Sequence, residues 1–132
     1  MELTIASQAG WLLLGAAGLS AVYELWRAIA RTGVMKYDSI RAWLLSMTVV
    51  VVEVVVAALL LAGWEWAPHA GLVLATGLFL VSVFYYGPKV LFERRPGLVD
   101  HFEDRVFTAL LAIVAVLLGY QLLGVTLTAK LS

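Results

Sequence analysis

The chain has 132 residues, of which 63% are hydrophobic and 14% charged, and its mean hydropathy is +0.96. Soluble domains are typically about 45–50% apolar and about 25% charged, so the composition argues against an ordinary water-soluble protein. A formal net charge of zero gives no sign of a nucleic-acid-binding surface, and the absence of cysteine excludes disulfides and thiolate-bound metal centres.

Four apolar stretches predict four membrane-spanning helices, over residues 5–27, 42–63, 71–86 and 106–125. The second stretch has 22 residues. As a helix it would be about 33 Å long, enough to cross a hydrocarbon core of about 30 Å. Because lipid offers the backbone no hydrogen-bond partners, such a crossing must be helical despite its many valines. We therefore expect an all-α polytopic membrane protein, folded as one four-helix transmembrane domain over residues 1–132.

The connections between these stretches differ in length and polarity. No Lys or Arg precedes the first stretch, whereas a cleavable signal peptide begins with a basic region, so we expect a retained helix. The short turn at residues 64–71 makes the second and third helices an antiparallel hairpin. Gly87 and Pro88 are expected to end the third helix. Residues 89–105 then form a charged loop, of which residues 93–105 are either solvated or folded as a short interfacial helix.

The positive charges predict the orientation in the membrane. Eight of the nine Lys and Arg residues lie in the first and third connections, and none lies in the second. Cytoplasmic loops of membrane proteins carry an excess of Lys and Arg. We therefore expect these two connections in the cytoplasm, both termini outside, and a multi-pass protein of the cell (plasma) membrane.

The two basic connections share a short pattern. Arg31 and Arg95 are each followed by a glycine two residues later and by a second arginine ten residues later, Arg41 and Arg105. The pattern suggests two tandem helical hairpins related by an axis along the membrane normal. A chance match between two arginine-rich loops is the alternative.

Glu53 is the main candidate for function, because it lies near the middle of the second stretch. A charged side chain there costs about 2.5 kcal/mol or more. Its helical face carries small residues, among them Ser46 and Ala57, so we expect it to face another helix. Either it handles a proton or a cation, or it is a neutral side chain hydrogen-bonded across a helix interface. The possible partners are Ser20, Thr76, Ser82, Thr108, Gln121 and the Glu53 of a neighbouring copy.

Two further sets of residues are expected to make contacts. Small residues at helical spacing should let helices approach closely; they are Ala17, Ala21, Ser46, Ala57, Thr108, Ala112, Ala115 and Gly119. Arginines of the cytoplasmic connections should contact lipid headgroups or a partner; they are Arg27, Arg31, Arg41, Arg94, Arg95 and Arg105. His69 and His101 are expected on opposite sides of the membrane and so predict no metal site. No cofactor is indicated.

Four spans in about 130 residues, with Arg41-Ala42 opening the second, resemble the membrane-associated eicosanoid and glutathione metabolism enzymes. Those enzymes are trimers that bind glutathione between subunits. Their second span continues with an Asn and then a Glu at three-residue intervals, and here these positions are Leu45 and Thr48. The resemblance implies a glutathione-dependent membrane enzyme, but the residues that would hold glutathione are missing.

A four-helix unit of this size has little interior left once its helices are packed. The leading hypothesis is therefore an accessory or structural subunit of a larger membrane complex or homo-oligomer. A homo-oligomeric proton- or cation-coupled transporter or channel that uses Glu53 is the alternative, and an enzyme like those named above is the third. The expected partners are the lipid bilayer, other membrane subunits or further copies of the chain, and no nucleic acid.

Overall fold

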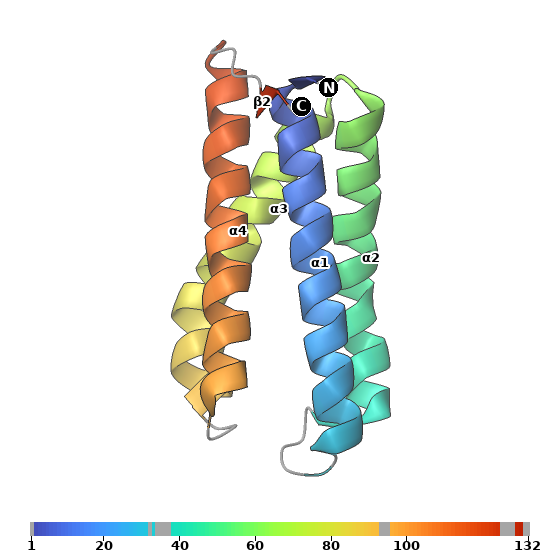
Figure 1. Cartoon of the computed structure of the whole chain (residues 1–132), viewed down its shortest axis with the longest axis vertical. Helices are drawn as coiled ribbons and strands as arrows, with labels where there is room; N and C mark the ends of the chain where they lie inside the picture. The colour runs from blue at the N-terminus through green and yellow to red at the C-terminus, as the bar shows by residue number, and fades with distance from the viewer. Residues whose placement is uncertain (1, 32, 34–37, 93–95, 125–128, 131–132) are drawn as a thin grey trace.

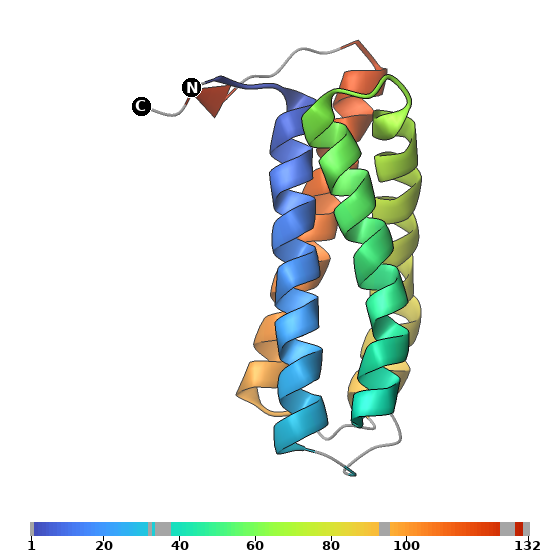
Figure 2. The same ribbon diagram turned by 90° about the vertical axis from the view of Figure 1, so that its right-hand side faces the viewer.

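The computed structural model describes the chain except for residues 1, 32, 34–37, 93–95, 125–128 and 131–132. Its helices are α1 (Ile5–Ala30), α2 (Ile40–Ala62), α3 (Ala67–Val81), the π-helix η1 (Ser82–Leu91) and α4 (Leu98–Leu122). Since η1 continues α3 directly, the described residues form four helices that are long and apolar enough to cross a membrane. Two short strands, β1 (Glu2–Leu3) and β2 (Ala129–Lys130), pair antiparallel beside the chain ends (Figure 2).

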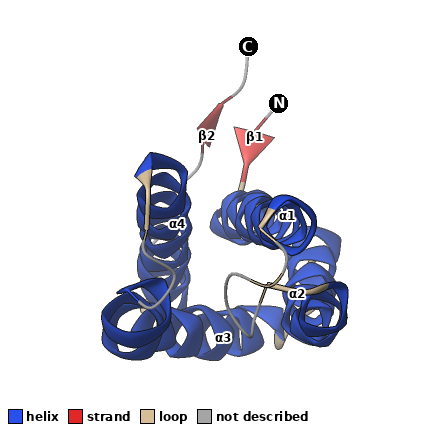
Figure 3. Ribbon diagram, turned by 90° about the horizontal axis from the view of Figure 1, so that it is seen from below, coloured by secondary structure: helices blue, strands red, loops and turns tan. Residues whose placement is uncertain are grey.

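The four helices surround a common axis. α1 packs against α2 and α4, α3 packs against α4, and α2 also contacts α3. Figure 3 shows this ring from below. We call the end at which α2 and α4 begin the loop end, and the opposite end, which holds β1 and β2, the terminal end (Figure 1). Both chain termini therefore lie at one end of the bundle, as an even number of crossings requires.

Local sequence features determine where α1 and α2 begin and where α2 ends. The Thr4 side chain accepts a hydrogen bond from the Ser7 N–H at 3.2 Å, and Ser39 accepts one from the Ala42 N–H at 3.1 Å, so both residues cap exposed helical donors. Gly63 ends α2 with a φ of 79°, a left-handed conformation that glycine adopts without steric cost. The expected second helix at residues 42–63 is therefore observed with small shifts at its ends.

The third helix is longer than the sequence predicted. It begins at Ala67, with Pro68 in its first turn, where the missing proline N–H has no helical partner to lose. It also continues through Gly87 and Pro88, which were expected to end it. There the backbone widens into η1, and a Cβ at residue 87 would lie 3.1 Å from the Ser82 carbonyl oxygen. Because glycine has no Cβ, the backbone can adopt the wider π-helical turn at this position. The helix therefore continues through Gly87 and Pro88 instead of ending there.

The fourth helix begins at Leu98, not at residue 106, and ends at Leu122. The Gly97 N–H donates to Asp100 Oδ2 at 2.9 Å, so an acidic side chain in the first turn satisfies an exposed backbone donor. Of the charged residues expected in the loop at 89–105, Asp100, Glu103, Asp104 and Arg105 lie in the first two turns of α4, Lys89 lies in η1, and residues 93–95 are outside the described structure. Sequence hydropathy placed the boundary too late because it marks where a helix becomes apolar, not where it starts.

The interior is divided along its length. The buried apolar cluster comes entirely from the half of each helix nearer the terminal end; its members are Ala9, Leu13, Val56, Ala57, Leu60, Ala67, Ala75, Leu111, Val114 and Leu118. Except for Glu53, the buried polar residues lie in the half nearer the loop end; they are Arg27, Asp38, Ser82, Asp100 and Glu103. The terminal half thus has a mainly apolar core, whereas the loop half buries charged and polar side chains beside apolar ones such as Ala28, Val90 and Leu91.

Candidate functional site

Glu53 lies near the boundary between these two halves. It is 1% exposed, and Val56, Ala57 and Leu60 share its buried face of α2. Neither of its carboxyl oxygens has a hydrogen-bond partner among the described residues. An intramembrane acid was visible in the sequence, but only the structure places it inside the bundle without a polar neighbour to satisfy it.

The side chains considered as partners for Glu53 are engaged or located elsewhere. The hydroxyls of Ser82 and Thr108 hydrogen-bond to each other, which joins η1 to α4. Thr76 is exposed on the outer surface of α3. Gln121 is half-buried close to the terminal end of α4, and its Oε1 atom is buried without a partner in the described part of the chain. Among the described residues of one chain, no hydrogen bond therefore explains why an acid stands at position 53.

A cavity of about 140 Å³ lies in the loop half, between α1, η1 and α4. Its polar lining comes from Ser20, Glu24, Ser82, Tyr86, Glu103 and Asp104, and its apolar lining from Leu78, Val81 and Phe107. The volume is sufficient for a few water molecules or a small cation, since each water occupies about 30 Å³ in the liquid. Asp104 also accepts a hydrogen bond of 3.4 Å from Ser82.

The packing of α1 against α2 places Glu53 nearer the terminal end than most of this cavity, and neither Glu53 nor any other α2 residue lines the cavity. A Cβ at Gly10 would lie 3.1 Å from the Ala57 carbonyl oxygen, and Trp43 Nε1 donates to the Ala21 carbonyl at 3.1 Å. Glu53 therefore lies opposite the α1 segment between Gly10 and Ala21. Helical side chains lean toward the N-terminus of their helix, which for α2 is the loop end. Its carboxyl group thus leans toward the end of the bundle that holds the cavity.

The inner end of the cavity is apolar. Leu78 and Phe107 line it and also pack against the buried apolar cluster of the terminal half. These two side chains consequently close the cavity toward the terminal end. The π-helix η1 supplies two of the polar lining residues, Ser82 and Tyr86, and π-helical turns recur at functional sites in proteins.

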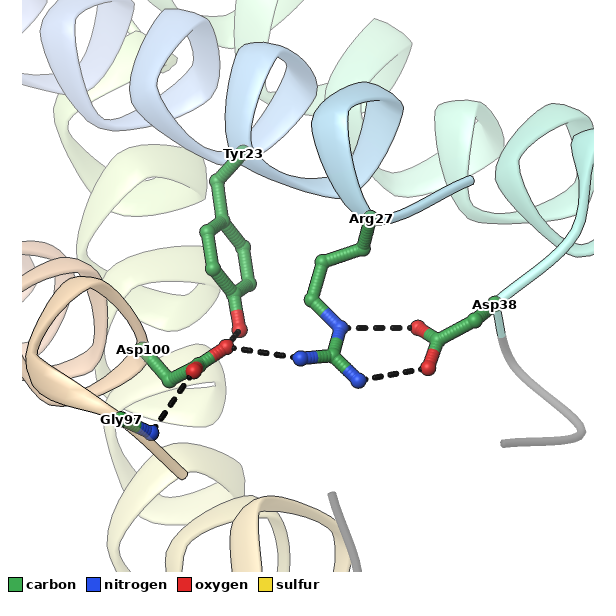
Figure 4. A network of polar contacts seen from close by, with 5 residues as sticks. All are labelled: Tyr23, Arg27, Asp38, Gly97 and Asp100. Carbon is green, nitrogen blue, oxygen red and sulfur yellow. Dashed lines mark hydrogen bonds and ion pairs between the residues drawn. The ribbon is translucent and has the colours of Figure 1, made fainter. Parts of the chain in front are cut away.

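Beside the cavity, a buried ion network joins α1, the segment before α2, and α4 (Figure 4). Arg27 Nε donates to Asp38 Oδ1 at 3.0 Å, and Arg27 Nη2 to Asp38 Oδ2 at 2.6 Å. Arg27 Nη1 donates to Asp100 Oδ1 at 3.0 Å, and the Tyr23 hydroxyl donates to the same oxygen. Because Arg27 is 1% exposed, Asp38 0% and Asp100 3%, the network is shielded from solvent and ties three elements together.

The sequence did not predict this network. Arg27 was grouped with the arginines expected to contact lipid or a partner, whereas it lies inside the protein. Tyr23 and Arg27 are four residues apart and so share a face of α1, a signal that could have suggested a joint role. Their acidic partner Asp100 is 73 residues from Arg27 in the chain, a distance no local pattern spans.

Of the remaining arginines of that group, three lie at or near the loop end: Arg31 directly after α1, Arg41 in the first turn of α2 and Arg105 in α4. Arg31, Arg41 and Arg105 are exposed, and Arg31 stacks over the Trp26 ring at 5.6 Å from its centroid. Arg94 and Arg95 are outside the described residues. His69 is exposed on α3 and His101 half-buried on α4, and the described residues contain no cluster of His, Asp and Glu suited to a metal ion.

The small residues expected to pack fall into two groups. Ala17 and Ala57 are fully buried, and the close contact between α1 and α2 also involves Gly10. Ala21 and Ser46 are half-buried, and Ser46 donates to the Trp43 carbonyl at 2.7 Å. On α4, Thr108, Ala112, Ala115 and Gly119 are only half-buried. The buried face of α4 is instead formed by Leu111, Val114 and Leu118.

No protein-family model matches the chain, and no curated protein or solved structure matches it either. The two positions at which this chain departs from the glutathione-binding membrane enzymes, Leu45 and Thr48, also point away from the bundle interior: Leu45 is 68% exposed and Thr48 is exposed. The site must therefore be interpreted from its own chemistry.

Proposed function

We propose that the chain is an integral membrane protein of four spans that takes up a proton or a small cation at Glu53. The observation that carries this proposal is a carboxyl group buried within the bundle, both of whose oxygens lack a hydrogen-bond partner in the described structure. The chain then corresponds to the transporter-like alternative from the sequence, with Glu53 as the acid that binds the ion.

Membrane insertion is supported by the outer surface of the bundle. α2 exposes a nearly continuous apolar face, with Leu44, Leu45, Val51, Val52 and Val55 among its members. In water such a face would be costly, whereas lipid tails solvate it. The arginines Arg31, Arg41 and Arg105 are exposed at or near the loop end, and the short turn between α2 and α3 carries no Lys or Arg. This charge asymmetry favours a cytoplasmic loop end.

The energetics of Glu53 favour an exchangeable ligand. Burying an ionised carboxylate without a partner costs several kcal/mol, and a buried polar group without a hydrogen bond costs about 1–3 kcal/mol. A proton or a bound cation neutralises the charge, and a water molecule completes the hydrogen bonds. Ionisable residues inside membrane spans commonly mark ion or proton pathways for this reason.

Access is expected from the loop end. The cavity between α1, η1 and α4 lies on that side of Glu53, whereas fully buried leucines fill the axis on the other side. Leu13, Leu60 and Leu111 are among these. An ion taken up from the cytoplasm enters this cavity first and has to pass Leu78 and Phe107 to reach Glu53, and release to the opposite side requires the terminal half to open. This arrangement fits alternating access better than a continuously open pore.

The test is proton or cation uptake by the purified chain in liposomes that contain a pH-sensitive dye. We expect uptake with the natural sequence, its loss in Glu53→Gln, and its retention in Glu65→Gln, a matched change at an exposed acid in the turn between α2 and α3. Absence of uptake with the natural sequence, or uptake unaffected by Glu53→Gln, would refute the proposal.

An accessory or structural role is the second candidate, and the exposed apolar face of α2 supports it, because a partner helix could cover that face as well as lipid could. Co-purification from native membranes in mild detergent distinguishes the two. A stable heteromeric complex, together with no ion uptake by the isolated chain, would favour the accessory role. The chain alone or as a homo-oligomer, with uptake dependent on Glu53, would favour the proposed function.

A further inference from the structure

An apolar groove of about 430 Å³ runs along the outside of the bundle between α1 and α4 in the loop half. Leu19, Val22 and Trp26 line it from α1, and Val99 and Phe102 from α4. Val22, Val99 and Phe102 are exposed, so large apolar side chains remain open to the surroundings here. The groove is separate from the polar cavity of the proposed site, although Glu103 borders both.

The groove has a basic end. Arg31 lies just beyond α1, is exposed, and holds its guanidinium over the Trp26 ring at 5.6 Å. A cation–π contact of this kind orients the guanidinium and keeps it next to the groove. The surface therefore combines an apolar groove with a positive charge at the end of the groove nearer the loop connections.

The ion network supports the inner wall of the groove. Tyr23 lines it, and its hydroxyl donates to Asp100, which is also bound by Arg27. The Tyr23 and Trp26 rings lie 6.1 Å apart, centroid to centroid. Because these contacts fix α1 relative to α4, the groove is formed before any ligand arrives, which lowers the entropic cost of binding.

We propose that this groove binds one anionic phospholipid of the leaflet nearest the loop end, with an acyl chain between α1 and α4 and the phosphate on Arg31. Leu19 to Trp26 extends over about 10 Å of α1, at about 1.5 Å per residue. One leaflet contributes about 15 Å of the hydrocarbon thickness, so the groove covers much of one chain's depth. The headgroup then lies at the interface, where Arg31 meets it. This inference depends on the proposed membrane insertion but not on ion uptake at Glu53.

The experiment is native mass spectrometry of the purified full chain in mild detergent, titrated with phosphatidylglycerol or with phosphatidylcholine of the same acyl chains. We expect one retained phosphatidylglycerol per chain and weaker retention of phosphatidylcholine. Arg31→Gln should weaken phosphatidylglycerol binding about fivefold, the usual contribution of one basic residue near an anionic lipid surface. Arg41→Gln is the matched control, since Arg41 is also exposed near the loop end but lies on α2 away from the groove.

A second variant tests whether an acyl chain occupies the apolar groove. Val22→Trp fills the groove from an exposed position and should weaken binding of both lipids. Soluble glycerol phosphate, which carries the anion without the chains, should not displace the lipid. Equal retention of the two lipids, equal effects of Arg31→Gln and Arg41→Gln, no effect of Val22→Trp, or displacement by glycerol phosphate would each overturn the inference. Glu53→Gln should bind phosphatidylglycerol normally, so failure here and failure of ion uptake are distinguishable.

Discussion

Replacing Arg27 by methionine tests whether the buried ion network holds the loop half together. Methionine keeps an unbranched apolar stem but is shorter and carries no charge, so Arg27→Met leaves Asp38 and Asp100 without the guanidinium that binds both. All three side chains are almost fully buried, and removing one partner of a buried ion pair costs about 3–5 kcal/mol. Against a typical total stability of about 5–15 kcal/mol, this is a large fraction.

Thermal unfolding in detergent, followed by circular dichroism, measures the effect. We expect Arg27→Met to lower the midpoint by roughly 10 °C or more, using about 3 °C per kcal/mol for a chain of this size. The exposed Arg41→Met is the control and should change stability by less than about 0.5 kcal/mol. A double-mutant cycle of Arg27→Met with Asp38→Asn should give a coupling of about 1–3 kcal/mol. A loss below about 1 kcal/mol for Arg27→Met, or no coupling, would refute the reasoning.

Two other predictions concern the contact between α1 and α2. Gly10→Ala should destabilise the chain by about 1–3 kcal/mol, because the added Cβ would lie 2.9 Å from Leu61 Cγ. Gly77→Ala on α3 is the control. Its added Cβ meets no atom within 4 Å, so the change should be neutral or stabilising by up to about 1 kcal/mol. Trp43→Phe should cost about 0.5–1.5 kcal/mol by removing the hydrogen bond to the Ala21 carbonyl. Unfolding midpoints in detergent measure each change, and equal midpoints for the two alanine variants would contradict the close approach at residue 10.

The four helices could be predicted from the sequence because length and hydropathy determine them. A 22-residue apolar stretch allows few structures, and the observed α2 agrees closely with it. The ends were harder to predict. Gly87 and Pro88 normally end an α-helix, but a wider π-helix accommodates them, and nothing in a local sequence distinguishes these outcomes. The start of α4 was missed because its first turns are charged.

The candidate site was predictable only in part. A single acid in an apolar stretch identifies Glu53, since its position in the sequence alone makes it costly. The cavity of the loop half and the Arg27 network depend on how α1, η1 and α4 meet, and such contacts join residues far apart in the chain. The duplication of two hairpins remains a prediction; residues 93–95 of the second connection, on which the pattern partly rests, lie outside the described structure.

Infrared difference spectroscopy of the chain in lipid vesicles tests the central claim most directly, because it detects the carbonyl stretch of a protonated carboxyl group. We expect a band that changes when pH is raised or a cation is added, that is absent from Glu53→Gln, and that persists in Glu65→Gln. Identical spectra for the natural sequence and Glu53→Gln at every pH would show that this carboxyl group exchanges neither a proton nor a cation.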